Sequence, residues 1–255
     1  MRVAVCVKHA VDETELRMGP DGSPLLAGAA AKISTFDKNA VEEALRVKGS
    51  GGGEVVAFSV GPADAKKSLK EALAMGADKG VLVVCDPAGL DSLGTSRLLA
   101  AAIARSGPFD AVLCSEGSSD VYTGLVPPML GEVMGLPYVG YVRKLEVTDG
   151  GARAERSLED SIESVEVSSP FVASVVSEIN EPRYPTLIQI MQASKKPVEE
   201  LTPGQLAPGA QTSRVSVASM TAAQSRRNLS LVEGTPDEAA AKLVGLLSKA
   251  GVLRA

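Results

Sequence analysis

The chain has 255 residues, of which 45% are hydrophobic and 22% are charged, and this composition excludes a wholly disordered protein. Only 3% of the residues are aromatic, the formal net charge is -5, and the chain has one histidine and three cysteines. These numbers argue against a nucleic-acid-binding protein and against an ordinary zinc site. No apolar run approaches the roughly 20 residues that span a bilayer, so we expect no membrane insertion.

The first half of the chain alternates apolar runs with amphipathic stretches. Near-continuous runs of Val, Ala and Leu are typical of parallel strands that are buried on both faces. The strands are predicted at residues 3–7, 54–60, 80–85 and 110–115, and the helices at residues 36–48, 63–75, 92–105 and 123–134. This order predicts an α/β fold with a doubly wound, mainly parallel, Rossmann-like sheet. Ligands of such sheets bind beyond the carboxyl ends of the strands.

Two regions depart from this alternation. The turn sequence Gly-Pro-Asp-Gly at residues 19–22 predicts an inserted hairpin within residues 15–33. Between residues 138 and 180, four strand-like runs follow one another without helices, which predicts an antiparallel extension that includes residues 171–179. The glycine-rich run at residues 49–53 follows a helix and precedes a strand. This order is the reverse of a phosphate loop, so we interpret the run as a turn.

The composition changes again near residue 195, where the chain becomes rich in Pro, Ser and Ala. We therefore expect an α/β domain over residues 1–197 and an extended C-terminal arm over residues 198–255. The arm ends in an amphipathic helix, because residues 235–238 (Thr-Pro-Asp-Glu) form a capping box. Its apolar stripe consists of Ala240, Leu243, Val244 and Leu247. The pattern favours a partner surface for this arm, and packing on its own domain is the alternative.

The chain has few candidate catalytic residues. His9 is the only histidine, and neither a phosphate loop nor a Gly-x-Gly-x-x-Gly motif after a strand is present. We expect His9 to be a surface or hydrogen-bonding residue and expect no catalytic site and no metal site. Cys6, Cys85 and Cys114 lie at strand ends, and their odd number indicates free thiols in a cytoplasmic protein.

Two other stretches suggest binding. Residues 115–124 form a loop rich in hydroxyl groups that leads into a helix expected to start near Thr123, where free N–H groups bind phosphate. The alternative is an ordinary loop in which Asp120 or Thr123 caps the helix. Residues 180–197 combine crowded apolar side chains with flanking prolines, which suits transient docking to another protein. A core helix is the alternative for this stretch.

Five motifs, in order along nearly the whole chain, resemble one family. They are Val7-Lys8-His9, Ser34 to Leu45, Ser59 to Pro62, Ala72 to Asp78, and Asn180 to Tyr184. In this order they resemble the β subunit of electron transfer flavoproteins.

The resemblance implies an electron carrier with no turnover chemistry of its own. Members pair with an α subunit and carry electrons from flavin-dependent dehydrogenases, such as acyl-CoA dehydrogenases, to a quinone reductase or other acceptor. It implies that the α subunit holds most of the redox FAD and that the β subunit binds a structural AMP. The alternatives are an electron-bifurcating type with a second FAD in the β subunit, and a stand-alone AMP-binding module.

The resemblance also implies site residues. Leu187 matches the anchor for dehydrogenases within a recognition loop at about residues 175–197, and Glu163 matches a residue that meets the flavin domain of the α subunit. The residues matching the nucleotide site are Cys6, Ser34, Thr35, Phe36, Asp37, Val60, Ser115, Glu116, Gly117, Ser118, Ser119, Asp120, Thr123, Gly124, Leu125 and Val126.

Some positions depart from the pattern of the family. Pro127 stands where many members have Gly, which removes one N–H donor. Val121 and Tyr122 replace the Gly-Asp of bifurcating members, and both changes favour AMP over a second FAD. Ile188 and Gln189 replace a frequent Pro-Asn, which indicates an unusual dehydrogenase partner.

Overall fold

The computed structural model of the chain describes residues 1–49, 53–206, 209, 213–222 and 229–253. Residues 50–52 of the expected glycine-rich turn and several positions of the expected arm lie outside this part. The chain divides into two compact units, Met1–Met220 and Thr221–Ala255, and each is described by itself. No helix within the described ranges is long and apolar enough to cross a membrane.

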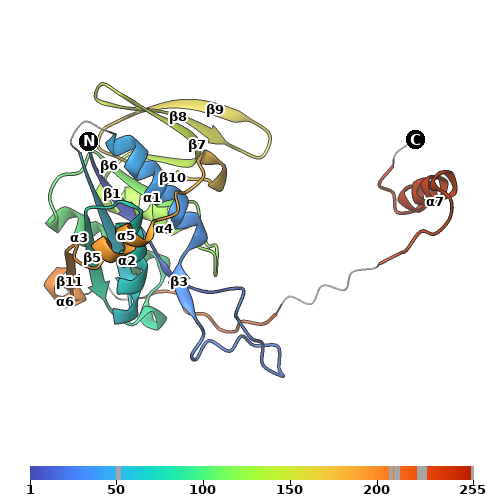
Figure 1. Ribbon diagram of the computed structural model, residues 1–255, viewed down its shortest axis with the longest axis horizontal. Helices are drawn as coiled ribbons and strands as arrows, with labels where there is room; N and C mark the ends of the chain where they lie inside the picture. The colour runs from blue at the N-terminus through green and yellow to red at the C-terminus, as the bar shows by residue number, and fades with distance from the viewer. Residues whose placement is uncertain (50–52, 207–208, 210–212, 223–228, 254–255) are drawn as a thin grey trace. The chain divides into compact units, whose positions relative to one another are not determined.

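The first unit is built on a nine-stranded sheet with the order β11-β5-β4-β1-β6-β10-β7-β8-β9 (Figure 1). The strands are β1 (Arg2–Cys6), β4 (Glu54–Gly61), β5 (Lys79–Val84), β6 (Ala111–Ser115), β7 (Tyr138–Thr148), β8 (Gly151–Ser157), β9 (Ile162–Ser168), β10 (Phe171–Val175) and β11 (Val198–Leu201). Seven of these strands pair in parallel, and β8 and β9 extend the sheet in the antiparallel sense. The expected α/β fold with its antiparallel extension is confirmed.

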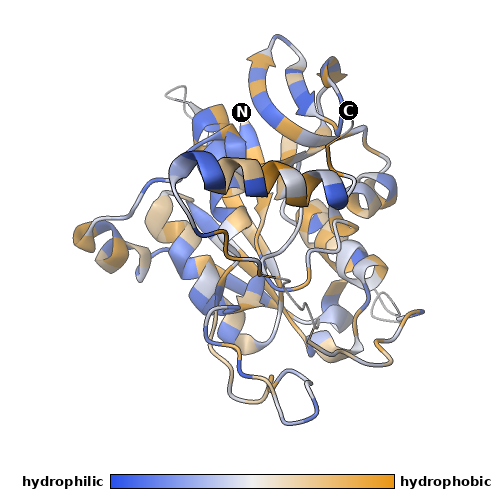
Figure 2. Ribbon diagram, turned by 90° about the vertical axis from the view of Figure 1, so that its right-hand side faces the viewer, coloured by the Kyte–Doolittle hydropathy of each residue, from blue (hydrophilic) through white to orange (hydrophobic). Residues whose placement is uncertain are grey.

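Helices cover both faces of the parallel strands. They include α1 (Thr35–Lys48), α2 (Lys66–Met75), α3 (Ser92–Arg105), α4 (Val126–Met134), and the short η1 (Ala63–Ala65) and η2 (Pro87–Gly89). Successive strand residues point to opposite faces. Val3 and Val5 therefore pack in the same core cluster as α1 and α2, while Ala4 and Cys6 pack in the cluster of α3 and α4. The strands at the centre are mostly hydrophobic, as Figure 2 shows.

The direction of β10 differs from the expectation for residues 171–179. We expected an antiparallel strand, but β10 pairs in parallel with β6 on one side and with β7 on the other. All five of its residues are buried, because it fills an interior place in the main sheet. The chain after it turns through η3 (Ser177–Ile179) instead of continuing as a strand.

The inserted hairpin is confirmed. Strands β2 (His9–Val11) and β3 (Ala31–Ile33) pair antiparallel, and Met18 bridges Pro24 nearer the tip. The hairpin leaves the sheet just after β1 and returns directly before α1. It therefore lies beside the carboxyl end of β1 in the chain path.

The sheet continues past the boundary expected between residues 197 and 198. Strand β11 pairs with β5, and Glu199 and Glu200 form ion pairs with Lys79 (3.0 Å) and Lys66 (2.7 Å). Helix α6 (Pro203–Leu206) follows, and the first unit ends only at Met220.

The second unit contains α7 (Pro236–Lys249). The expected capping box forms, because the Thr235 N–H donates to Glu238 and the Glu238 N–H donates to the Thr235 hydroxyl. The helix carries hydrophobic and hydrophilic residues together (Figure 2), and none of its residues is buried.

Candidate functional site

The order of the strands reverses between β1 and β6. Strands β4 and β5 lie on one side of β1, whereas β6 and β10 lie on the other. A crevice forms beyond the carboxyl ends of the strands at such a switch point, and ligands bind there. Two loops leave the sheet at this place: residues 7–8 after β1 and residues 116–125 after β6.

Asp37, in the first turn of α1, holds both loops. Its carboxylate accepts a hydrogen bond from the Ser115 hydroxyl at the end of β6, and another from the Lys8 backbone N–H at 2.6 Å. Burial raises the pKa of Asp37 to about 7, although the hydrogen bonds from Ser115 and Lys8 favour the ionised form. The carboxyl group is thus a buried structural link between the two loops.

A second set of polar contacts closes the loop after β6. The Lys8 ammonium donates to Asp120 at 2.7 Å, and the Ser118 hydroxyl donates to the same carboxylate at 2.6 Å. Burial alone would raise the pKa of Asp120, but Lys8 and Ser118 lower it overall. The Ser119 N–H donates to the Ser34 hydroxyl at 3.1 Å, which joins the loop to the residue before α1.

The turn at residues 123–126 presents its N–H groups. Gly124 has a φ of 65°, and Leu125 is right-handed with φ -89° and ψ -28°. Within the described chain, the N–H groups of Thr123, Gly124 and Leu125 have no hydrogen-bond acceptor. Successive free N–H groups in alternating left- and right-handed residues form a concavity that binds anions.

The helix after this turn starts later than expected. We expected a start near Thr123 with Asp120 or Thr123 as the cap, but α4 starts at Val126, and Leu125 caps it without a side-chain hydrogen bond. Pro127 and Pro128 occupy its first turn and have no N–H. The donors of this site are therefore the turn residues before the helix, and the helix itself adds few.

One hydroxyl group of the loop has no partner. The Ser119 Oγ is buried and makes no hydrogen bond to any described residue. An unpaired buried hydroxyl costs free energy, so such a group in a loop indicates a ligand or a water molecule that would satisfy it. The free N–H groups, this hydroxyl and the Lys8 ammonium are the kinds of donor that bind phosphate groups.

An aromatic contact lies over the same loop. The rings of Phe36 and Tyr122 meet edge to face with centroids 5.4 Å apart. Tyr122 has a φ of 45°, which is unusual for a residue other than glycine. A Cβ on Gly117 would lie 2.7 Å from the Tyr122 ring, so this close approach requires glycine. The Tyr122 ring thus occupies the space beside the loop.

The structure brings most of the candidate nucleotide residues to this one edge of the sheet. Cys6 ends β1, and Val60 lies near the end of β4, on the far side of β1. The residues at the start of α1 and in the loop after β6 are Ser34, Thr35, Phe36, Asp37, Ser115, Glu116, Gly117, Ser118, Ser119, Asp120, Thr123, Gly124, Leu125 and Val126. Residues so far apart in the sequence meet only because the sheet is doubly wound.

Leu187 and Glu163 lie elsewhere. Leu187 is the first residue of α5 (Leu187–Ala193), within what we call the docking segment, residues 180–196. The side chains of Leu187, Ile188, Ile190 and Met191 are 52–78% exposed, so α5 is not a core helix. Glu163 is exposed on β9, with Arg156 Nη1 3.7 Å from its carboxylate.

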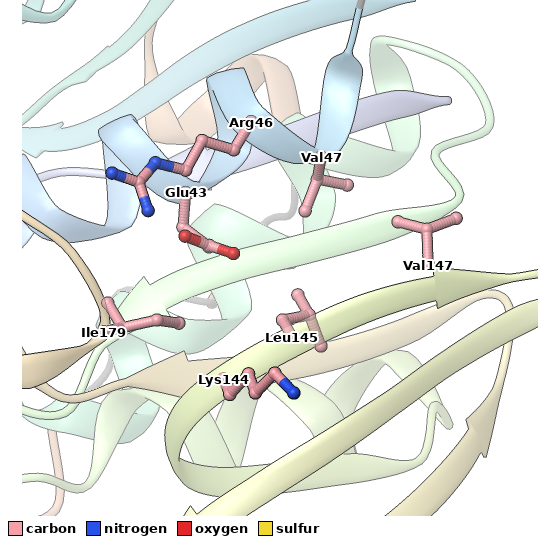
Figure 3. A pocket seen from close by; sticks show the side chains of 7 residues that line it. All are labelled: Glu43, Arg46, Val47, Lys144, Leu145, Val147 and Ile179. Carbon is pink, nitrogen blue, oxygen red and sulfur yellow. The ribbon is translucent and has the colours of Figure 1, made fainter.

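A separate groove of about 400 Å³ runs between α1 and β7. Figure 3 shows Glu43 pointing from α1 toward Leu145, with Arg46 and Lys144 at the sides. The wall near η3 is Ile179. None of the candidate nucleotide residues lines this groove.

Sequence reasoning missed two groups that matter here. Lys8 was seen only as part of a motif, although its position directly after β1 is a signal for the switch-point crevice. The ion pair between Glu42 and Arg183, with Nε 2.7 Å from the carboxylate, joins α1 to the docking segment. No local sequence pattern predicts this pair, because its residues are far apart in the chain. His9 bonds Ser68 at 2.8 Å, as expected of a hydrogen-bonding residue. Within the described ranges, no cluster of His, Cys, Asp and Glu could hold a metal ion.

Comparisons with known proteins agree with one another. The family model described as "Electron transfer flavoprotein domain" matches residues 26–206. The chain is 38% identical over 205 residues to the electron transfer flavoprotein subunit beta of Thermoanaerobacterium thermosaccharolyticum, covering 79% of this chain and 78% of the relative. It is 35% identical over 203 residues to that of Bacillus subtilis, with 79% of each covered. It is also 35% identical over 202 residues, 78% of this chain and 77% of the relative, to the caffeyl-CoA reductase-Etf complex subunit CarD of Acetobacterium woodii.

Proposed function

The chain belongs to the electron transfer flavoprotein family, and on this premise we propose that it pairs with an α subunit as the β subunit of a heterodimeric electron carrier. The heterodimer would carry electrons from flavin-dependent dehydrogenases, such as acyl-CoA dehydrogenases, to a quinone reductase or other acceptor. The chain itself would be an electron-carrier subunit and not an enzyme. Its three free cysteines support a cytoplasmic location.

The β subunit would bind one AMP at the carboxyl ends of β1 and β6. The observation that carries this proposal is the turn at residues 123–125, whose N–H groups have no acceptor within the described chain and which follows β6, next to the switch point of the sheet. Lys8 would add a positive charge, and the Ser119 hydroxyl would gain the partner it lacks. Cys6, Ser34 and Val60 would lie nearer the base and ribose.

FAD supplies the electron-transfer chemistry of such a heterodimer, and most of its binding site would belong to the α subunit. This chain would contribute the antiparallel extension, where Glu163 faces solvent on β9. It would also contribute Leu187 on the exposed face of α5 as an anchor for the dehydrogenase. Neither residue contacts the proposed nucleotide site.

A second FAD in place of AMP is the alternative occupant. We retain this alternative because one of the matched relatives is named as a subunit of a caffeyl-CoA reductase-Etf complex. Tyr122 argues against it, because Val121 and Tyr122 stand where the resemblance gives Gly-Asp in bifurcating members, and the Tyr122 ring packs on Phe36 beside the loop. These two positions therefore favour the smaller nucleotide.

Release of the bound molecule tests the proposal. The chain copurified with its α subunit would be denatured by heat, and the supernatant separated by chromatography with absorbance detection. We expect one AMP and one FAD per heterodimer. Two FAD and no AMP would favour the bifurcating alternative. A well-folded β subunit that neither releases nor binds an adenine nucleotide in calorimetry would overturn the proposed site.

A further inference from the structure

The docking segment begins next to α1, where the side-chain amides of Asn39 and Asn180 form reciprocal hydrogen bonds. The Asn39 side chain on α1 donates to the Asn180 backbone carbonyl at 2.8 Å and to the Ser177 carbonyl at 3.0 Å. The Asn180 side chain donates in return to the Asn39 carbonyl at 3.1 Å and to Glu43 at 3.0 Å. These four bonds fix the backbone at the start of the segment to one face of the helix.

Arg183 adds a charged contact one turn along α1. Its Nε donates to Glu42 at 2.7 Å, its Nη2 at 3.0 Å, and its backbone N–H at 3.2 Å. The Glu42 side chain is only 6% exposed. Burial would raise the pKa of Glu42, but the hydrogen bonds and charge of Arg183 outweigh it and lower the pKa overall. A planar guanidinium that binds a carboxylate through two donors also fixes the direction of the chain.

The far end of the segment is held as well. The Lys196 ammonium donates to the carbonyls of Leu73 (2.9 Å) and Ala77 (2.6 Å) at the end of α2. Between the two attachments, Thr186 and Gln189 cap α5 reciprocally. The side chains of Asn180, Arg183 and Lys196 thus attach the segment to α1 and to the end of α2, while the apolar side chains of α5 are exposed.

We propose that Glu42 is a positioning residue for partner docking, because the Glu42–Arg183 contact holds the docking segment in the orientation that exposes Leu187. The inference rests on the proposed function, in which α5 docks dehydrogenases. A segment that is ordered before it docks loses less conformational entropy on binding, so the contact favours docking without touching the partner. Nothing in this role requires Glu42 to contact nucleotide or flavin.

The chain offers a matched pair of variants. Glu42→Gln would place a buried amide against the donors of Arg183 and could unfold the protein. Arg183 is 46% exposed, so its substitution carries less risk to folding. Arg46 also donates to Glu42, at 3.2 Å from the next turn of α1, but it does not contact the docking segment. Arg183→Gln therefore removes the two guanidinium donors from Glu42, and Arg46→Gln removes an equal charge from the same carboxylate and leaves those two donors in place.

Hydrogen exchange of the full chain, copurified with its α subunit, is the first measurement. In Arg183→Gln we expect the amides of residues 184–193 to exchange about threefold faster or more, with amides of β1 and β6 unchanged. Arg46→Gln should leave the exchange of residues 184–193 as in the wild type. Equal exchange in the wild type and Arg183→Gln would overturn the proposal.

Steady-state electron transfer from an acyl-CoA dehydrogenase is the second measurement. We expect Arg183→Gln to raise the KM for the dehydrogenase about fivefold, with kcat and nucleotide content within about twofold of the wild type. A raised KM for Leu187→Ala beside an unchanged KM for Arg183→Gln would overturn the positioning role alone. Unchanged KM values for both variants would instead remove docking by α5 from the proposed function.

Discussion

At the scale of single residues, Asp37 makes the free energy of unfolding depend on pH. Its folded pKa of about 7 lies above its ordinary value of 3.8, so between these values the folded protein keeps a proton that the unfolded chain releases. The free energy of unfolding contributed by Asp37 therefore falls as pH rises from about 4 to about 7. The slope is at most about 1.4 kcal/mol per pH unit for one proton.

We expect Asp37→Asn to remove this part of the pH dependence. Urea unfolding of the wild type and the variant at several values between pH 4 and 7.5 would measure it. Asp12→Asn is the control, because the hydrogen bond from Lys32 holds the pKa of Asp12 at about 2, below its ordinary 3.8, so above about pH 5 Asp12 is ionised in the folded and the unfolded chain alike. Parallel curves for Asp37→Asn and the wild type would contradict the prediction.

Thr123 provides a second test at this scale. Its side chain is exposed at the turn, where its hydroxyl would donate to a phosphate oxygen. We expect Thr123→Val to weaken AMP binding about tenfold, because one charge-assisted hydrogen bond is lost. Calorimetric titration would measure this, with Thr148→Val at the exposed end of β7 as the control. An unchanged affinity would place the phosphate elsewhere.

At the scale of elements, the docking role proposed for α5 can be tested separately from folding. Leu187 is 78% exposed, so we expect Leu187→Ala to leave the melting temperature unchanged. An apolar anchor in a partner pocket contributes about 1–3 kcal/mol, so reduction of the heterodimer by its dehydrogenase should slow tenfold or more. Stopped-flow absorbance and a thermal melt would measure both. Leu26→Ala, at a 52% exposed leucine of the hairpin insertion, should change neither quantity. A lower melting temperature for Leu187→Ala would make Leu187 a core residue.

Elements whose pattern is local were predictable from the sequence. The strands that became β1, β4, β5 and β6 lie within one or two residues of their predicted bounds, because a buried parallel strand is a continuous apolar run. Helix α3 begins and ends at the predicted residues. The start of α4 was missed although the sequence carries a signal for it, because Pro127 and Pro128 are tolerated only in the first turn of a helix and so argue against a start near Thr123.

Nonlocal pairings were not predictable. The direction of β10 is set by its place between β6 and β7 in the folded sheet. The formation of β11 as a strand depends on pairing with β5 at the edge of the sheet. In the site, the loop sequence indicated phosphate binding, but Lys8 and Asp120 are 112 residues apart and meet only in the folded sheet. The matched relatives confirm the family that the motifs indicated, whereas the occupant of the site stays a prediction.

At the scale of the whole molecule, the boundary between the two units predicts where proteases cut. The first unit ends at Met220, and β11 is held in the sheet well before it. We expect limited proteolysis of the isolated chain to remove the second unit first, leaving a stable fragment that retains β11. Mass spectrometry would identify the fragment. The proposed α subunit should slow this cleavage, and a stable fragment ending near residue 197 would contradict the boundary at Met220.

The exposed apolar side chains of α5 and α7 also bear on how the protein is made. Leu187 on α5 and Leu243 and Val244 on α7 are 49–78% exposed in this chain. In the proposed heterodimer the α subunit would cover the stripe of α7, and a chain synthesised in excess would lack this partner. Surplus copies would then associate with one another or be removed by chaperones and proteases. Balanced synthesis of the two subunits is therefore a condition for accumulating this one, and its soluble yield should rise when both are expressed together.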